Sequence, residues 1–289
     1  MLNLFEHSIE TDYRKLDCDG ILFVEYKCIP GESELDSLWS LNSYLVFVTS
    51  GYKTWITPEE EVTITAGQAV FCKKGACMMR HFYEKEFCAL IMFFTQDFIR
   101  EVSLEYQMTL KKDQQIDDSN FHLVKLNVDD GLKLYFESVG SYIFQEKAPA
   151  DQLLKLKFKE LILQVLTNDS NLKLKSYFLS ILQEGNRSME SIIRKNLCFN
   201  LSIEDYAKLC NRSLSAFKRD FKQEFGKSPL KWLVEERLKY AKARLISIDE
   251  SIVELALFSG FESTEHFIRC FKKYYGEPPL RFKSLHFKR

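Results

Sequence analysis

The chain has 289 residues, of which 46% are hydrophobic, enough for two domains that each bury a core, so disordered and collagen-like classes are excluded. The formal net charge of −1 hides an uneven distribution: from Arg187 onward the net charge is +8, and over the preceding 186 residues it is −9. The basic C-terminal part is therefore suited to bind a polyanion, and the acidic part before it is not.

The N-terminus and the cysteines indicate a cytoplasmic protein. The first residues, MLNLFEHSIETDYRK, carry carboxylates where a signal peptide needs an apolar run, and the longest strongly apolar patch, residues 88–94, is too short to span a bilayer. The eight cysteines lack the CxxC pairs of a zinc or redox site, so most are expected to be small buried hydrophobes. Cys72 and Cys77 are the closest pair, and we interpret them as incidental cysteines in a turn. A metal-binding or redox role is the alternative.

Five segments in the first hundred residues predict β-strands. They are rich in β-branched and aromatic residues, turn residues separate them, and in one of them Val62 and Ile64 alternate with threonines. The segments are residues 21–29, 43–51, 52–58, 61–76 and 87–94. The pattern predicts a small antiparallel β-barrel or jelly roll.

This barrel offers few ligands for a metal. A catalytic cupin places two or three histidines and a carboxylate around its metal, whereas His81 is the one histidine between His7 and His122. We therefore expect no metal and no cofactor, and a barrel that either binds a molecule without chemistry or is filled by its own side chains.

Two segments after the barrel predict helices. Residues 131–144 and 150–168 have helical periodicity, with lysines between apolar positions such as Leu153, Leu156, Leu161 and Val165. Helices that pack over the barrel are the simplest interpretation.

The basic region contains the same irregular motif twice. FKRDFKQEFGKSPLKW begins at Phe217, and FIRCFKKYYGEPPLRF begins 50 residues later at Phe267. Each copy predicts two short helices joined by a tight turn, with a serine cap before the second helix and a glycine after it. Asn211 stands in the first turn, where a residue tolerant of positive φ is needed, and Gly260 stands in the second.

A longer helix of about 17 residues is predicted between the two copies, roughly 25 Å long at 1.5 Å rise per residue. One side of it is predicted to be buried, comprising Leu230, Leu233, Val234, Arg237, Leu238, Ala241 and Leu245. This helix would hold the two helix-turn-helix units at a fixed separation.

The repeat resembles the DNA-binding domain of the AraC/XylS family of bacterial transcription regulators. The landmarks are Ser213 followed by xxxFxRxFKxxFGxSP, then RLKYAKARLI, then GFESxxxFxRxFKxxxGxPP, in that order. The resemblance covers about the last 100 residues and implies that each second helix enters the major groove of double-stranded DNA, the two insertions lying about one helical turn apart.

The resemblance also assigns expected DNA contacts by position in the motif. Base-contacting residues are expected to be Ser215, Lys218, Arg219, Thr264, Glu265, Ile268 and Arg269. Phosphate-contacting residues are expected to be Lys222, Lys227, Lys272, Lys273, Arg281 and Lys283. Since Lys218 and Arg219 can donate to guanine, whereas Ile268 can touch only a thymine methyl, the first helix-turn-helix is expected to discriminate more strongly. For Arg219 and Arg269, a salt bridge on a solvated face is the alternative.

The predicted fold class is therefore α+β, and the predicted domains are 1–170 and 187–289. The first domain resembles, more loosely, the degenerate cupin-like sensor domain that precedes the DNA-binding domain in this family. That resemblance implies a homodimer formed through a helix of the sensor domain, and RNA polymerase as a partner if the protein is an activator. No membrane association is expected.

An amphipathic, anionic small molecule is the effector that the sequence predicts. Lys73, Lys74 and Arg80 flank the hairpin CKKGACMMR in an otherwise acidic domain, and an apolar lining could come from Trp55, Phe71, Met78, Phe82 and Tyr83. Simple solvation of these cations at a turn is the alternative.

The sequence therefore predicts a transcription regulator, an activator and not an enzyme, and two alternative classes stay open. One is an enzyme with an appended DNA-binding module, either a metal cupin or a cysteine-based alkyl acceptor, which needs a histidine cluster or a reactive cysteine in a basic, exposed setting. The other is a regulator controlled by a protein partner, for which a filled barrel and an exposed apolar patch would be the sign.

Overall fold

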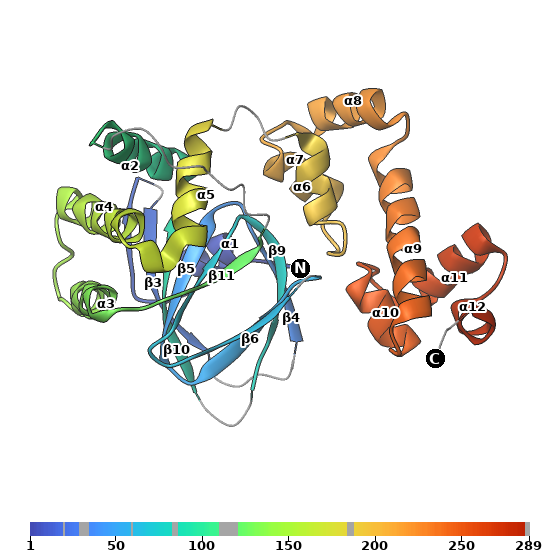
Figure 1. Cartoon of the computed structure of the whole chain (residues 1–289), viewed down its shortest axis with the longest axis horizontal. Coiled ribbons are helices and arrows are strands. Elements are labelled where there is room, and N and C mark those ends of the chain that lie inside the picture. The colour runs from blue at the N-terminus through green and yellow to red at the C-terminus, as the bar shows by residue number, and fades with distance from the viewer. Residues whose placement is uncertain are drawn as a thin grey trace. The chain divides into compact units, whose positions relative to one another are not determined.

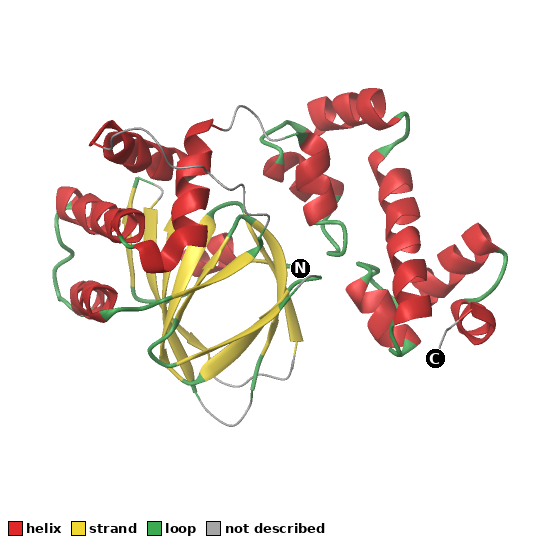
Figure 2. Ribbon diagram, viewed as in Figure 1, coloured by secondary structure: helices red, strands yellow, loops and turns green. Residues whose placement is uncertain are grey.

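A computed structural model describes residues 1–19, 21–28, 35–58, 60–82, 86–109, 121–183 and 188–286. The chain divides into two compact units, Leu2–Asn186 and Arg187–Arg289 (Figure 1). Every strand described lies in the first unit, and the second is built of helices (Figure 2). No helix in these ranges is long and apolar enough to cross a bilayer.

The first unit is built on two sheets. The five-stranded sheet has the order β1-β4-β9-β6-β7, and the six-stranded sheet has the order β11-β8-β5-β10-β3-β2. Neighbouring strands pair antiparallel except β1 and β4, which are parallel. The strands are β1 Leu2–Asn3, β2 Lys15–Cys18, β3 Ile21–Cys28, β4 Leu35–Ser40, β5 Ser43–Ser50, β6 Tyr52–Ile56, β7 Glu61–Thr65, β8 Ala69–Cys72, β9 Gly75–Arg80, β10 Phe87–Phe94 and β11 Leu123–Leu126.

The six-stranded sheet is buried on both faces. On β5, Val46 and Val48 face the five-stranded sheet and belong to the core between the sheets, whereas Leu45 and Phe47 face the helices and belong to a second core. A strand with two buried faces needs apolar side chains at successive positions, which explains the continuous runs SYLVFV and ALIMFF. The edge strand β7 has one exposed face and alternates instead, with Ile64 buried.

Helices cover the outer face of the six-stranded sheet (Figure 1). Phe47 stacks on Phe136 of α3 at 4.1 Å between ring centroids, and Phe23 stacks on Phe158 of α4 at 3.8 Å. The helices of this unit are α1 Leu4–Glu10, α2 Gln96–Thr109, α3 Asp130–Ile143, α4 Asp151–Thr167, the 3-10 turn η1 Asp169–Asn171, and α5 Leu172–Gln183.

The predicted fold class is confirmed. The five predicted β segments correspond to β3, β5, β6, β7 with β8, and β10, and the two predicted helices are α3 and α4. The sequence did not predict β1, β2, β4, β9, β11, α1, α2 or α5. Of these, β9 was interpreted as part of a turn because CKKGACMMR carries turn-like and basic residues.

The second unit consists of α6 Met189–Lys195, α7 Ile203–Leu209, α8 Leu214–Phe225, α9 Pro229–Ser247, α10 Ile252–Phe258, α11 Thr264–Tyr275 and α12 Pro279–His286. The long helix α9 has 19 residues, with Leu233, Leu238, Ala241 and Leu245 buried as predicted. Leu230 is a correction, because it is 64% exposed. It lies in the first turn of α9, where Pro229 occupies the buried position instead.

Cys72 and Cys77 lie inside the barrel, with side chains 2% and 5% exposed. The Tyr44 hydroxyl lies 3.5 Å from the Cys77 sulfur. Burial raises the pKa of Cys72 well above its ordinary value and raises the pKa of Cys77 to about 11. Both side chains are therefore core residues in the thiol form at neutral pH.

We predict that iodoacetamide at pH 8 leaves Cys72 and Cys77 unmodified in the folded protein. With a pKa of about 11, only about one Cys77 side chain in 1,000 is a thiolate at that pH, and the barrel also shields it. Mass spectrometry of the alkylated peptides measures this, with the half-buried Cys210 and Cys270 as references that react. Labelling of Cys77 at the rate of Cys270 would contradict the assignment.

Candidate nucleic-acid interface

The first helix-turn-helix consists of α7 and α8. Ser202 and Asp205 form a complete capping box at the start of α7. Asn211 takes the positive φ that the turn requires, 53°, and the backbone amide of Arg212 then donates to the carbonyl of Ala207 at 2.9 Å. The hydroxyl of Ser213 caps α8 by accepting from the amide of Ala216 at 3.3 Å.

The second helix-turn-helix, α10 and α11, is built the same way. Ser251 and Glu254 form its capping box, and Gly260 takes a φ of 78° in the turn. Ser263 caps α11. Both second helices end at a glycine in the left-handed conformation, Gly226 in α8 and Gly276 in α11.

Helices α8 and α11 each bury one apolar face and expose the other. Phe217, Phe221, Phe267 and Phe271 are fully buried. The exposed faces hold Ser215, Lys218, Arg219, Glu265, Ile268 and Arg269, with Thr264 half-buried. The residues that the sequence assigned to base contacts are therefore brought together on the solvent faces of these two helices.

The phosphate candidates are not equally accessible. The exposed ones are Lys222, Lys272, Lys273 and Arg281, and Lys227, also exposed, pairs with Glu235 at 2.5 Å. Lys283 is 17% exposed and donates to the Asp249 carboxylate and to the Glu250 carbonyl, both at 2.8 Å. Its ammonium therefore ties α12 to the loop before α10.

Helix α9 shares a core with each helix-turn-helix. Trp232 packs on Phe221 and Phe225 of α8, with ring centroids 5.7 and 4.8 Å apart. At the other end, Leu238, Ala241 and Leu245 join a cluster with the two buried phenylalanines of α11.

Arg237, in the middle of α9, is 6% exposed. Its Nε donates to the Leu197 carbonyl at 2.8 Å and its Nη2 to the Phe199 carbonyl at 2.6 Å, which fixes the segment that leads into α7. A Cβ on Gly260, in the turn of the second helix-turn-helix, would lie 2.9 Å from the Cys198 carbonyl carbon and 3.0 Å from Arg237 Nε. This junction, made of Leu197–Phe199 with Arg237 and Gly260, therefore brings both helix-turn-helix units against α9.

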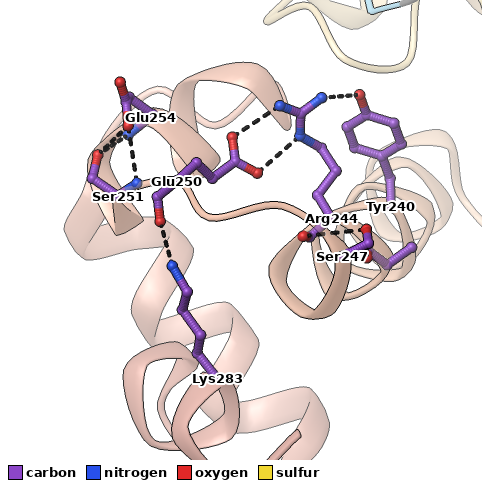
Figure 3. A network of polar contacts seen from close by, with 8 residues as sticks. Tyr240, Arg244, Ser247, Glu250, Ser251, Glu254 and Lys283 are labelled. Carbon is purple, nitrogen blue, oxygen red and sulfur yellow. Dashed lines mark hydrogen bonds and ion pairs between the residues drawn. The ribbon is translucent and has the colours of Figure 1, made fainter. Parts of the chain in front are cut away.

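A second polar network fixes the end of α9 (Figure 3). Arg244 donates through Nε and Nη2 to the two carboxylate oxygens of Glu250, both at 2.9 Å, and through Nη1 to the Tyr240 hydroxyl at 3.2 Å. The hydrogen bonds to Glu250 raise the pKa of Arg244 above its ordinary value. Because the Glu250 side chain is 8% exposed, this ion pair is largely shielded from solvent and orients the loop from which α10 starts.

The structure does not bring the predicted effector residues into one pocket. Trp55 is buried between the sheets, whereas Phe71 faces the helices. Lys73 is 7% exposed, with its ammonium 3.8 Å from the ring centroid of Phe121 and 4.3 Å from that of Tyr177.

The remaining members of that set are also separated. Arg80 pairs with Glu61 at 2.6 Å, Lys74 is half-buried, and Met78 is buried. Phe82 lies against Tyr52, and Tyr83 lies outside the described residues. Within the described ranges, no group of three His, Cys, Asp or Glu side chains could hold a metal ion.

The sequence did not identify the partners of these cations, although a salt bridge was the alternative stated for Arg219. Arg212 and Arg219 both bond the carboxylate of Asp220, and Arg244 bonds Glu250. The sequence did carry one signal for the ion pairs of Asp220. An acidic residue stands here within a basic recognition helix, at the position where the second copy has Cys270. Ion pairs of this kind depend on side-chain direction, which spacing alone does not specify.

Two family descriptions match the chain. The ExsA N-terminal regulatory domain matches residues 43–177, and a helix-turn-helix domain matches residues 206–284. The chain is similar to the virulence regulon transcriptional activator VirF of Yersinia enterocolitica, with 23% identity over 240 residues that cover 81% of this chain and 86% of VirF. It is 29% identical to the transcriptional regulator ExsA of Pseudomonas aeruginosa over 110 residues, 37% of this chain and 40% of ExsA.

Among solved structures, apo ToxT from Vibrio cholerae aligns with 91% of this chain and 97% of its own, with 14% identity and a TM-score of 0.43. A double helix-turn-helix unit that follows a regulatory β unit defines a two-domain, DNA-binding transcription regulator. The chain belongs to the AraC/XylS family of transcription regulators.

We predict that Gly260→Ala destabilises the second unit by about 2 to 4 kcal/mol, because it adds both a clash with the Cys198 backbone and a strained positive φ. Gly226→Ala is the matched control: φ is also positive at Gly226, but its added Cβ meets nothing within 4 Å. The control should cost only about 1 kcal/mol. Denaturant unfolding measures both, and equal losses would show that the junction is not tightly packed.

Proposed function

We propose that this chain is a sequence-specific transcription activator that inserts α8 and α11 into successive major grooves on one face of double-stranded DNA. The observation that supports this most is that two capped helices with exposed polar faces are attached to one connecting helix by a shared core. Helix α9 has 19 residues, or about 28 Å of rise, which is close to the roughly 34 Å of one DNA turn.

Charge supports the same proposal. The second unit has a net charge of +8, and four of the phosphate candidates are exposed, namely Lys222, Lys272, Lys273 and Arg281, the last of which lies 3.9 Å from the Glu277 carboxylate. Cations on this surface would bind phosphates and release counterions, so affinity should fall steeply as salt rises. The base contacts are proposed for Ser215, Lys218, Arg219, Thr264, Glu265, Ile268 and Arg269, and the phosphate contacts for Lys222, Lys227, Lys272, Lys273, Arg281 and Lys283.

We predict that Arg219→Ala changes base preference, whereas Lys222→Ala changes the affinity for DNA of any sequence. Arg219→Ala should relax base preference at one operator position by about 1 to 3 kcal/mol, because it removes a guanidinium that can donate to guanine O6 and N7. Lys222→Ala should weaken binding to all sequences alike and lower the salt slope by about one, because it removes a phosphate contact. Binding-site selection and salt titrations of the full chain separate the two, and uniform loss in both variants would make Arg219 a phosphate contact.

A homodimer formed through the first unit is the second part of the proposal. Helix α4 buries one face in the core but also exposes Leu153 and Leu156, which are 39% and 59% exposed. Leu156 borders a groove of about 460 Å³ between α2 and α4, whose lining combines apolar side chains such as Phe98 with six charged ones, among them Glu101 and Lys159. The two leucines lie three residues apart and so share one face of α4, and a second copy of α4 would cover this face.

We predict that Leu156→Glu converts the protein to a monomer in sedimentation-velocity experiments while its unfolding temperature changes little. The side chain is mostly exposed in the protomer, so a charge there acts on the interface and not on the core. Leu134→Glu on α3 is the matched control, since Leu134 is 65% exposed and the variant should remain a dimer. A dimer in both variants would remove α4 from the interface.

Control of the activator would run through the first unit. VirF, which aligns with 81% of this chain, is named a transcriptional activator, and this supports a partnership with RNA polymerase, action on DNA in the cytoplasm and a role other than an enzyme. The core between the sheets is occupied by large side chains such as Trp55, Tyr44 and Phe93. Packing of this kind supports control by a protein partner more than by a small molecule inside the barrel, so an amphipathic anionic effector would have to bind elsewhere.

A further inference from the structure

Asp220 lies on α8 between two arginines. Its Oδ1 accepts from Arg219 Nε at 2.9 Å, and its Oδ2 accepts from Arg212 Nη1. The side chain of Asp220 is 25% exposed, that of Arg212 is 38% exposed and that of Arg219 is 74% exposed. Because Arg212 belongs to the turn and Asp220 to the middle of the helix, one carboxylate connects the turn to the recognition helix and to its arginine.

Stability is a weak explanation for this arrangement. Exposed ion pairs contribute little to folding, because solvent screens the charges and the long side chains lose conformational entropy. The apolar face of α8 is already anchored by Phe217 and Phe221, which are fully buried. The larger effect of the carboxylate is therefore on the direction of the Arg219 side chain.

Asp220 does not occupy the end of the Arg219 guanidinium, formed by Nη1 and Nη2, that can contact a base. The bond to Asp220 uses Nε, so the donors of Nη1 and Nη2 are not used by it, and the Arg219 side chain is 74% exposed. That end carries the paired donors that match O6 and N7 of guanine. An arginine that is held in this direction before binding loses less side-chain entropy when it meets the base.

The carboxylate also opposes nonspecific binding. A negative charge beside the DNA-facing surface is repelled by phosphates, and it competes with them for Arg219 and Arg212. On correct DNA the guanine contact leaves the Nε bond to Asp220 intact, whereas a phosphate that approaches Nε has to displace the carboxylate. Both effects raise the ratio of specific to nonspecific affinity.

We propose that Asp220 is a positioning residue that determines specificity, directing Arg219 at one guanine in the major groove and limiting its binding to phosphate. The proposal rests on the base contact proposed above for Arg219. In the second helix-turn-helix the position 50 residues on is Cys270, so Arg269 has no carboxylate from the corresponding position. Base discrimination is therefore sharper at the half of the operator that α8 reads.

The test uses the full chain and the operator that it enriches from a random DNA pool. Asp220→Asn keeps the shape of the side chain but removes its charge, and Glu224→Gln, an exposed change on the same helix, alters the net charge by the same amount. Binding constants are measured on the operator, on each single-base variant and on unrelated DNA, over a range of salt. Thermal unfolding verifies that every variant is folded.

We expect Asp220→Asn to discriminate about tenfold less strongly at one guanine and to bind unrelated DNA several-fold more tightly. The dependence of its DNA affinity on salt should be steeper by about 0.9 in log-log slope, because Arg219 gains a phosphate contact. Glu224→Gln should keep the base preference of the unaltered chain. Asp220→Glu should retain most of the discrimination, because it retains the charge. A merely structural role for Asp220 would change the unfolding temperature without moving the preferred base or the salt slope.

Arg219→Ala distinguishes failure of this proposal from failure of the base contact on which it rests. If Arg219→Ala loses preference at a guanine and Asp220→Asn keeps it, Asp220 does not position Arg219. If Arg219→Ala keeps every base preference, the base contact itself is wrong. When both variants lose the same guanine, and the double variant loses no more than Arg219→Ala, the proposal stands.

Discussion

The guanidinium of Arg237 occupies the center of the helical unit, where the two helix-turn-helix motifs meet the connecting helix. It is almost fully buried, so its charge depends on hydrogen bonds to the carbonyls of Leu197 and Phe199. Charge-assisted hydrogen bonds of this kind contribute about 1.5 to 3 kcal/mol, and loss of their acceptors would leave a buried cation unsatisfied. Gly260 packs against the same segment because a side chain there would overlap it.

The directions of the recognition helices follow from this junction. One end of α9 is packed on α8 through Trp232, and the other end shares a core with α11 and is held by the ion pair between Arg244 and Glu250. With both ends and the middle of α9 fixed, α8 and α11 are held relative to each other within the unit. The specificity of the protein then depends on which side chains these helices expose and on how neighbours such as Asp220 orient them.

Much of this could be predicted from the sequence, because caps, turns and buried stripes are local. The repeat at a spacing of 50 residues, Asn211 at positive φ, and the glycines that end α8 and α11 follow from short-range stereochemistry. What could not be predicted depends on contacts between distant segments. Leu230 fits the apolar stripe of α9 but is exposed, and the bond between Arg212 and Asp220 requires knowledge of side-chain directions. In the first unit, β2, β4 and β11 have short, mixed sequences that become strands only through pairing with neighbours.

The two helix-turn-helix motifs act as one body of fixed spacing. Binding to DNA in which the spacing of the half-sites is altered tests this most directly. Operators would be made with 5 or 10 base pairs inserted between the segments protected by α8 and α11, and affinities would be measured by fluorescence anisotropy. A body held by the Arg237 junction cannot follow a half-turn rotation of one half-site, so the insertion of 5 base pairs should reduce affinity to that of a single half-site. The insertion of 10 base pairs should do the same, because α9 spans only about 28 Å. Unchanged affinity for either operator would show that the two units move independently and would contradict the account.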